Sequence, residues 1–382
     1  MNNSMALDNN WKDNWTCFKN ELPHQTAPFS KKNWGNINHS LCSYQGKLKP
    51  AIAYHLVKTF VPSGGKLFDP FAGVGTIPFE GALNGIESFG MDISNMCYYI
   101  SQAKVGITNK SKAIEYIEKL NNYIKTNNNN IGDLMKYASF GLNKCLLDYY
   151  EKNTFKEILL ARLFFLENRP QNASEMVVIS SLLHILHGNR PYALSRKSHP
   201  ITPYAPTGDF IYKDLISKLK EKVNKYFSQA LPETFVPGKI FLQDSTFVWP
   251  HEVNNLDAII TSPPFYDSTR FYSANWIRLW FSGWEPDDFK IMPQLYIDER
   301  QKKDFEVYNP IFNQAKERIK NGGVFVLHLG KSKKCNMGEI LKTLSKRWFN
   351  HSELFDESVV HCDKFGIKDL GTVTDHQYLL LY

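Results

Sequence analysis

The chain of 382 residues lacks any long apolar run, and its first ten residues are polar. A membrane-spanning helix needs about 20 consecutive apolar residues, and a signal peptide needs an apolar stretch near its start. We therefore expect neither secretion nor a membrane partner, and we place the protein in the cytoplasm.

Cysteine is scarce and dispersed, with no close pair among Cys17, Cys42, Cys97, Cys145, Cys335 and Cys362. Such spacing predicts neither a CxxC zinc site nor a disulfide framework. We therefore expect no metal and a reducing compartment.

The chain also has no large excess of one charge, because 45 basic residues against 38 acidic ones give a net charge of +7. Its sign suits a polyanionic partner, but charge alone does not establish nucleic-acid binding.

What the sequence does contain is a strand, a glycine turn, a helix and a second strand, in that order, between residues 65 and 92. Both strands end on an acid, at Asp69 and Asp92. This is the βαβ order of nucleotide-binding folds. Further strand patterns occur at 239–242, 256–261, 323–329 and 376–382. Helical patterns at 308–320 and 338–348 lie before and after the strand at 323–329. The order predicts an α/β fold with a doubly wound, Rossmann-like sheet.

Residues 103–237 interrupt this alternation, because they read mainly as helices, most clearly at 113–126 and 174–187. We therefore predict a mainly helical inserted lobe. The predicted units are an N-terminal arm at 1–38, a catalytic domain at 39–102 and 238–382, and the inserted lobe at 103–237.

The sharpest local pattern is the turn Asp69-Pro70-Phe71-Ala72-Gly73-Val74-Gly75-Thr76. Gly73 and Gly75 allow the backbone to turn tightly and to approach a ligand. Asp92 follows Gly75 at close to the roughly 20-residue spacing at which an acid binds ribose hydroxyls. The third glycine of the dinucleotide fingerprint and the P-loop pattern GxxxxGK[ST] are absent, which favours a nucleoside over a pyrophosphate ligand. An ordinary tight turn of an α/β sheet is the alternative.

A second pattern, Thr261-Ser262-Pro263-Pro264-Phe265, follows an apolar strand. The two prolines stiffen the backbone and donate no N–H, so the Ser262 hydroxyl and the Pro263 carbonyl provide uncharged acceptors. Two acceptors can orient an exocyclic amine of a base, while Phe265 offers a stacking face. On its own, such a segment is more often a loop than an active site.

Together the two turns resemble those of the amino-methyltransferases, which methylate exocyclic nitrogens of DNA bases with S-adenosylmethionine. DPFAGVGT is similar to the cofactor motif of that family, and TSPPF to its catalytic motif. The [ST]SPP[YF] form is typical of cytosine-N4 enzymes, whereas adenine-N6 enzymes usually carry an acid or Asn in place of Ser262. The resemblance implies catalytic roles for Ser262, Pro263, Pro264 and Phe265, and a cofactor site at Asp69, Phe71, Gly73, Gly75, Thr76 and Asp92.

The resemblance covers most of the chain outside the insertion. Tyr44-Gln45-Gly46-Lys47 is similar to the segment that contacts the methionine end of the cofactor, which implies a role for Lys47. Gln243-Asp244-Ser245 resembles the motif whose acid, here Asp244, reaches the adenine ring. Residues 368–377 resemble the closing hairpin of the cytosine-N4 group. Family members differ in where they place their target-recognition region, and the insertion is the candidate here.

Within the insertion, residues 187–208 contain no acid and interleave basic with aromatic side chains on a proline-rich loop. This chemistry suits phosphates and an extruded base. We predict DNA contacts from Arg190, Arg196, Lys197 and His199, with Tyr192 and Tyr204 nearby. The alternative is a connector whose tyrosines pack inward.

Arg270, just after the catalytic turn, is a further candidate for a phosphate contact. A structural salt bridge with an acid such as Asp267 is an equal alternative. Trp276 and Trp280 are assigned to core packing, as are the histidines, because nothing in their spacing requires a metal.

These patterns predict an enzyme that flips a cytosine out of double-stranded DNA and methylates its N4 by direct displacement. A restriction-modification or related defence context fits, with a cognate restriction endonuclease as partner. No Pro-Cys pair occurs, which excludes ring-carbon methylation by its usual motif. Adenine-N6 methylation is the nearest alternative, and an RNA guanine-N2 methyltransferase is more distant. A DNA-binding subunit that keeps the fold without catalysis is the alternative from another class.

Overall fold

The computed structural model describes residues 11–31, 34–42, 44, 46–127, 131–198, 204–266, 270–358 and 373–382. In this part of the chain, a seven-stranded sheet has the order β3-β2-β1-β4-β5-β7-β6. Its strands are β1 (Lys66–Asp69), β2 (Glu87–Asp92), β3 (Lys239–Leu242), β4 (Leu256–Thr261), β5 (Ile319–Ser332), β6 (Ser352–Ser358) and β7 (Val373–Leu381).

The strand order confirms the predicted doubly wound α/β fold. Strands β1 to β5 are parallel, while β7 runs antiparallel to both β5 and β6. The chain begins in the middle of the sheet at β1 and winds outward in both directions, so the switch point lies between β1 and β4. Ligands of open α/β sheets bind at the carboxyl ends of the strands beside such a point. Strand β6 is the one strand of this sheet that the sequence patterns did not predict.

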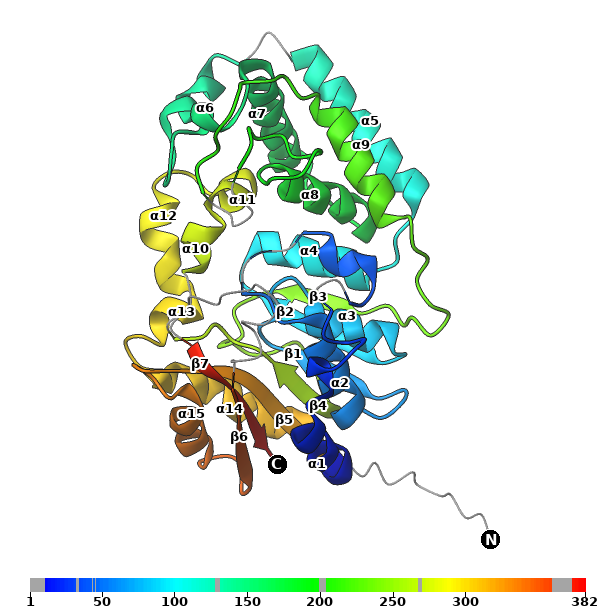
Figure 1. Cartoon of the computed structure of the whole chain (residues 1–382), viewed down its shortest axis with the longest axis vertical. Coiled ribbons are helices and arrows are strands. Elements are labelled where there is room, and N and C mark those ends of the chain that lie inside the picture. The colour runs from blue at the N-terminus through cyan, green and yellow to red at the C-terminus, as the bar shows by residue number, and fades with distance from the viewer. Residues whose placement is uncertain are drawn as a thin grey trace.

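Helices cover both faces of the sheet (Figure 1). They are α1 (Trp11–Glu21), α2 (Pro50–Phe60), α3 (Thr76–Leu83), α4 (Asn95–Val105), α14 (Asn309–Arg318) and α15 (Met337–Ser345). Successive strand residues point to opposite faces. Leu67 accordingly packs with residues of α1 and α2, while Phe68 packs with residues of α14 and α15. The N-terminal arm thus contributes a helix to the sheet, and its Trp15 and Phe18 are buried.

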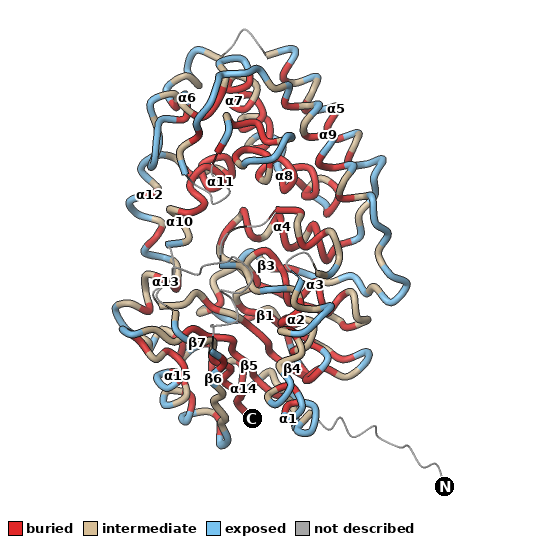
Figure 2. The backbone as a smooth tube through the Cα atoms, in the orientation of Figure 1, coloured by how far each residue is buried: buried red, intermediate tan, exposed pale blue. Residues whose placement is uncertain are grey.

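The segment between β2 and β3 continues past α4 into a group of helices that lies above the sheet in Figure 1. These are α5 (Lys110–Asn127), α6 (Leu146–Tyr149), α7 (Lys152–Glu167), α8 (Ala173–Ile185) and α9 (Leu215–Tyr226). Helix α5 buries one stripe of side chains, as an amphipathic helix does. Helix α8 is buried along nearly its whole length, so it forms the centre of this lobe (Figure 2).

The chain after the TSPPF turn returns to the same lobe. It forms α10 (Phe271–Ala274), α11 (Trp276–Phe281), α12 (Asp288–Ile291) and α13 (Ile297–Arg300). Arg162 of α7 donates to the carbonyl of Trp280 at 2.9 Å, and Arg278 of α11 donates to the carbonyl of Leu183 at 3.2 Å. Trp276 and Trp280 are fully buried, which confirms their assignment to core packing. Two separate parts of the chain therefore build the core of the helical lobe.

Short 3₁₀ helices complete the secondary structure at η1 (Pro23–Gln25), η2 (Ile37–Ser40), η3 (Asp133–Ser139), η4 (Met292–Leu295) and η5 (Phe305–Tyr308). In the described ranges, every helix is too short or too polar to cross a lipid bilayer.

Candidate active site

The glycine turn and the TSPPF turn lie side by side at the carboxyl edge of the sheet. They follow β1 and β4, which are paired in parallel with Phe68 opposite Ile259. The Thr261 hydroxyl donates to Asp69 Oδ1 at 2.6 Å, and the Phe71 N–H donates to the same oxygen at 3.0 Å. One carboxylate therefore holds the two turns together, although they are far apart in the sequence.

Asp69 is only 2% exposed. Burial raises the pKa of Asp69 to about 7, although the hydrogen bonds from Thr261 and Phe71 favour the ionised form. The carboxyl is therefore partly protonated near neutral pH, where an ordinary aspartate is ionised.

The two glycines of the turn meet different neighbours. Both have a positive φ, +52° at Gly73 and +70° at Gly75. A Cβ on Gly73 would lie 2.6 Å from the hydroxyl of Tyr44, whereas one on Gly75 would lie 2.5 Å from the Cβ of Ser101 in α4. Gly75 therefore serves the packing of the turn against α4. Gly73 instead faces the hydroxyl end of the Tyr44 side chain. Of the two glycines, Gly73 is therefore the one at which we expect a ligand to approach the backbone. Thr76 begins α3 and is buried.

Asp92 ends β2 beside this turn. Its Oδ2 accepts the Gly73 N–H at 3.0 Å and its Oδ1 accepts the Ser94 N–H at 2.8 Å. Burial raises the pKa of Asp92 to about 6. A carboxylate offers about four lone-pair positions. Asp92 thus keeps acceptor capacity for hydroxyl groups, which fits the sequence-based expectation of a ribose partner.

Two lysines near the turn donate to backbone carbonyls. Lys47 donates to the carbonyl of His39 at 2.8 Å, and burial lowers the pKa of Lys47 to about 8. Lys104 of α4 is fully buried and donates to the carbonyl of Val74, inside the glycine turn, at 2.5 Å. No sequence pattern indicated Lys104, because its position in α4 resembles that of any helical lysine.

Tyr44 comes from the segment before Lys47, in which Gln45 lies outside the described residues. Its ring contacts that of Phe271 edge to face at a centroid distance of 5.5 Å. Burial, together with Cys97, Asp92 and Asp69, raises the pKa of Tyr44 well above its usual value. Tyr44 is therefore a neutral hydroxyl over the glycine turn, and the sequence analysis gave it no role of its own.

Asp244, expected near an adenine ring, already holds partners at the end of β3. Its Oδ2 forms an ion pair with Arg300 Nη1 of α13 at 2.8 Å, and its Oδ1 accepts the Thr246 N–H at 2.9 Å. The sequence did not indicate Arg300, because the two residues meet only through the fold. The ring of Phe71, also expected at the cofactor, packs against Tyr308 at a centroid distance of 6.2 Å.

The TSPPF turn is fixed from behind by buried polar side chains. The carbonyl of Pro264 accepts the Gln301 Nε2–H at 2.9 Å, and Gln301 Oε1 in turn accepts the Tyr308 hydroxyl at 2.8 Å. Pro263 is buried, whereas Ser262 is partly exposed. The sequence analysis identified neither Gln301 nor Tyr308 as part of this turn.

The ring of Phe265 lies against β5. A Cβ on Gly330 would come within 2.5 Å of Phe265 Cδ2, so the glycine makes room for the ring. The Ser262 hydroxyl lies 3.0 Å from Nδ1 of His328, which also belongs to β5. His328 is buried, in keeping with the general assignment of histidines to the core, but it contacts the TSPPF turn directly.

The residues predicted to contact DNA differ in their surroundings. Arg190 is exposed and donates to the Tyr192 hydroxyl at 3.1 Å, and Lys197 is exposed as well. Arg196 donates to the carbonyls of Gly208 at 2.8 Å and Asp148 at 3.2 Å. Its guanidinium is therefore engaged within the lobe. His199 lies outside the described residues.

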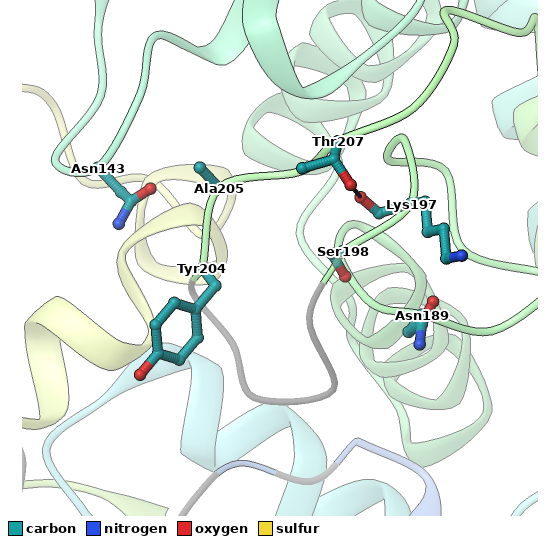
Figure 3. Close-up of a pocket in the computed structure, with 7 residues that line it drawn as sticks. All are labelled: Asn143, Asn189, Lys197, Ser198, Tyr204, Ala205 and Thr207. Atoms are coloured by element: carbon teal, nitrogen blue, oxygen red, sulfur yellow. Dashed lines mark hydrogen bonds between the residues drawn. The ribbon is translucent and has the colours of Figure 1, made fainter.

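A pocket of about 570 Å³ opens beside this loop, lined by Asn143, Asn189, Lys197, Ser198, Tyr204, Ala205 and Thr207. Figure 3 shows Asn143 and Tyr204 on one side of the pocket and Asn189 and Lys197 on the other. Tyr204 is 53% exposed. The lining thus combines amides, one cation and one accessible ring, and it contains no acid.

Arg270 is engaged as well. Its Nε lies 3.2 Å from Glu299 Oε1, and its Nη1 donates to the Tyr272 hydroxyl at 3.1 Å. The salt-bridge alternative is therefore present, although the acid is Glu299, and Asp267 lies outside the described residues. Across the described ranges, no group of three or more His, Cys, Asp or Glu side chains is arranged to hold a metal ion.

Comparisons with known proteins support a methyltransferase. Residues 38–143 match the family described as the RMKL-like methyltransferase domain. The type II methyltransferase M.MvaI of Kocuria varians is 24% identical over 290 residues, which are 67% of this chain and 61% of that protein. This chain thus matches less than two thirds of the relative's length.

Two solved structures are similar at low TM-scores. A TehB-like SAM-dependent methyltransferase from Corynebacterium glutamicum has a TM-score of 0.31 at 9% identity, covering 86% of this chain and 85% of that one. The rRNA methyltransferase aviRa from Streptomyces viridochromogenes has a TM-score of 0.31 at 9% identity, covering 93% of each chain.

The packing of the glycine turn predicts unequal costs for two matched substitutions. Gly75→Ala should lower the free energy of unfolding by about 2–4 kcal/mol, because the methyl group must displace α4 and φ stays positive. Gly73→Ala should cost about 1–2 kcal/mol, because it carries the φ penalty but displaces only the Tyr44 hydroxyl. Urea unfolding of both variants measures the difference, and equal losses would contradict the packing role of Gly75.

The raised pKa of Asp69 predicts a pH-dependent stability. Between the unfolded value near 3.8 and about 7, the folded state binds more protons, so this residue makes stability fall as pH rises. Asp69→Asn keeps both hydrogen bonds, because Thr261 and Phe71 donate to Oδ1 alone. The stability of the variant relative to the unaltered protein should rise from pH 4 to pH 7 and then level off.

The measurement is urea unfolding without added cofactor, at pH values from 4 to 8. Asp287→Asn is the control, because the ion pair and hydrogen bond with Lys290 lower the pKa of this exposed aspartate. A lowered pKa changes stability mainly below pH 4, so the stability difference for this control should stay nearly constant from pH 4 to pH 8. A stability difference for Asp69→Asn that does not change with pH would refute the shifted pKa.

Proposed function

We propose that this protein is an S-adenosylmethionine-dependent DNA methyltransferase that modifies N4 of cytosine. The observation that carries the proposal is the hydrogen bond from Thr261 to Asp69, which brings a nucleoside-type glycine turn beside a turn of uncharged acceptors. The similarity to a type II methyltransferase, as that relative is named, supports the reaction class and a DNA substrate. The cytosine-N4 assignment rests on the TSPPF motif.

The residues at the carboxyl edge of the sheet fit S-adenosylmethionine. Asp92 has acceptor capacity for ribose hydroxyls, and among the described residues the Tyr44 hydroxyl is the nearest group to the space that the missing side chain of Gly73 leaves. Asp69, Phe71, Gly75 and Thr76 belong to the same turn. Lys47 would contribute from the segment of Tyr44, and Asp244 from the segment that follows β3. When bound, the cofactor would supply an electrophilic methyl group on its sulfonium sulfur.

Ser262 and Pro263 would orient the exocyclic amine by accepting its hydrogen atoms, which directs the nitrogen lone pair toward the methyl group. Phe265 would supply a face for the flipped base, and Pro264 holds the turn through Gln301. No residue of the turn acts as a nucleophile or a strong base, since Ser262 is neutral. The proton leaves to solvent after methyl transfer, when the nitrogen has become acidic.

The helical lobe would contact the duplex through residues 187–208. Arg190 and Lys197 are exposed, and the pocket beside them carries amides and a tyrosine ring without any acid. Amide side chains pair with base edges, and lysine or arginine binds phosphate. Arg196 instead stabilises the loop itself. Arg270 would have to break its ion pair with Glu299 to bind phosphate, and the DNA contact of His199 stays a prediction from sequence. A restriction-modification context, with an endonuclease partner, follows from the same similarity.

The product of the reaction tests the proposal directly. DNA from an expressing host without methylation of its own should contain N4-methylcytosine, detected by mass spectrometry of the digested nucleosides. Ser262→Ala should lower the methylation rate at least tenfold while cofactor affinity, measured by calorimetry, stays nearly unchanged, because the hydroxyl acts on the amine.

Other products would identify the alternatives. N6-methyladenine alone would overturn the base assignment but keep the reaction class. Methylated guanine in RNA, with unmodified DNA, would favour an RNA methyltransferase. Duplex binding without any methylated base would favour a non-catalytic subunit.

The loop predicts a change in the salt dependence of DNA binding. Each phosphate contact contributes about 0.9 to the slope of log affinity against log salt. The double variant Arg190→Ala, Lys197→Ala should therefore flatten that slope by about 2, as measured by fluorescence anisotropy on a duplex.

The control removes the same charge elsewhere. Lys58 of α2 and Lys346, next to α15, are exposed on the sheet domain, away from the helical lobe (Figure 1). Replacing both with Ala should leave the slope nearly as it was. Equal slopes for the loop variant and the unaltered protein would identify the loop as a connector.

A further inference from the structure

A buried histidine on the neighbouring strand meets the catalytic turn. Strands β4 and β5 pair with Thr261 opposite Leu327, so the next residues, Ser262 and His328, also come together. Their contact joins Ser262 Oγ to His328 Nδ1 at 3.0 Å. His328 is only 3% exposed. The contact therefore follows directly from the strand register, because Ser262 is the first residue after β4.

Aromatic rings surround His328. The ring centroids of Phe265, His376 and Tyr378 lie 5.5, 4.8 and 5.2 Å from its own. Phe265 can come this close because Gly330 has no side chain. Nε2 of His328 is buried and has no hydrogen-bond partner among the described residues. Within the described residues, Ser262 is thus the hydrogen-bond partner of this imidazole.

The imidazole is neutral near pH 7. Burial and the neighbouring His376 lower the pKa of His328 well below its usual value, while Glu357 acts weakly in the opposite direction. A neutral imidazole has one N–H donor and one bare nitrogen acceptor. The nitrogen facing Ser262 can therefore accept the hydroxyl hydrogen.

The direction of the serine hydroxyl matters for the reaction. A free hydroxyl can rotate and donate its hydrogen to the amine nitrogen, which would occupy the lone pair that must attack the methyl group. A hydroxyl that already donates to an acceptor behind it presents only its own lone pairs to the amine. An acceptor behind Ser262 thus converts an ambiguous group into a fixed acceptor.

We propose that His328 is a positioning residue, which accepts the Ser262 hydroxyl hydrogen at Nδ1 and so turns the oxygen lone pairs toward the amine of the target base. This role rests on the proposed function, and it assigns His328 no contact with substrate or cofactor. The imidazole remains neutral throughout and takes no proton from the base.

A double-mutant cycle with the full-length chain tests this role. Ser262→Ala, His328→Leu and the variant carrying both are compared by the single-turnover rate of methyl transfer to a duplex. His328→Leu should slow transfer about 10- to 100-fold, with unchanged affinity for S-adenosylmethionine. The double variant should be no slower than Ser262→Ala within about twofold, because His328 acts only through the hydroxyl. His328→Asn should recover most of the rate, since its amide oxygen can reach the position of Nδ1.

Rate losses that multiply in the double variant would overturn the proposal, because they would show that His328 acts independently of Ser262. If His328→Leu does not fold, His328→Asn and His328→Gln carry the test, since the longer amide places its oxygen beyond the Nδ1 position. Equal rates for these two variants would then refute the role. Failure of the proposed function can be distinguished from failure of this role, because the unaltered protein itself would then transfer no methyl group to DNA.

Discussion

The buried carboxylate of Asp69 is the group on which the arrangement of this site depends. Its Oδ1 accepts from Thr261 at 2.6 Å and from the Phe71 N–H at 3.0 Å, and so joins two turns from chain segments 192 residues apart. Burying a carboxyl group is costly unless it is hydrogen-bonded. The raised pKa of Asp69 reflects that cost. The glycine turn, the TSPPF turn and the packing of α4 against Gly75 are all arranged around this contact.

The helical lobe is tied to the same site through α11. Arg162, which is 4% exposed, donates to the carbonyl of Trp280, and Arg278 donates to the carbonyl of Leu183. Residues 271–300 therefore lie between the TSPPF turn and the lobe, and the next residue, Gln301, donates to the carbonyl of Pro264. One segment thus contacts both the helical lobe and the TSPPF turn.

Local patterns predicted the centre of the sheet well. Strand β4 was expected at 256–261 and is found at Leu256–Thr261, because a parallel strand buried on both faces reads as a continuous apolar run. Strand β6 was missed because its sequence, Ser-Glu-Leu-Phe-Asp-Glu-Ser, is mostly polar, as suits a strand at the edge of the sheet beside β7. Residues 11–29, which contain helix α1, had no clear periodicity and were read as an irregular arm or short helices. Trp15 and Phe18 of this helix are buried by Phe60 and Tyr378, which no local pattern can indicate.

The sequence by itself determined the βαβ unit at the centre of the sheet and the two turns. Glycine and proline specify the local backbone conformation, and an acid at the end of a strand can be recognised from the sequence. Only the tertiary structure decided which groups those turns meet. Asp244 pairs with Arg300 across 56 residues, and Ser262 meets His328 across 66. Arg196, chosen for its charge, instead supports carbonyls of its own lobe. Hydrogen-bond partners of this kind depend on strand register and on how the lobe packs, and these are set by contacts between residues distant in the chain.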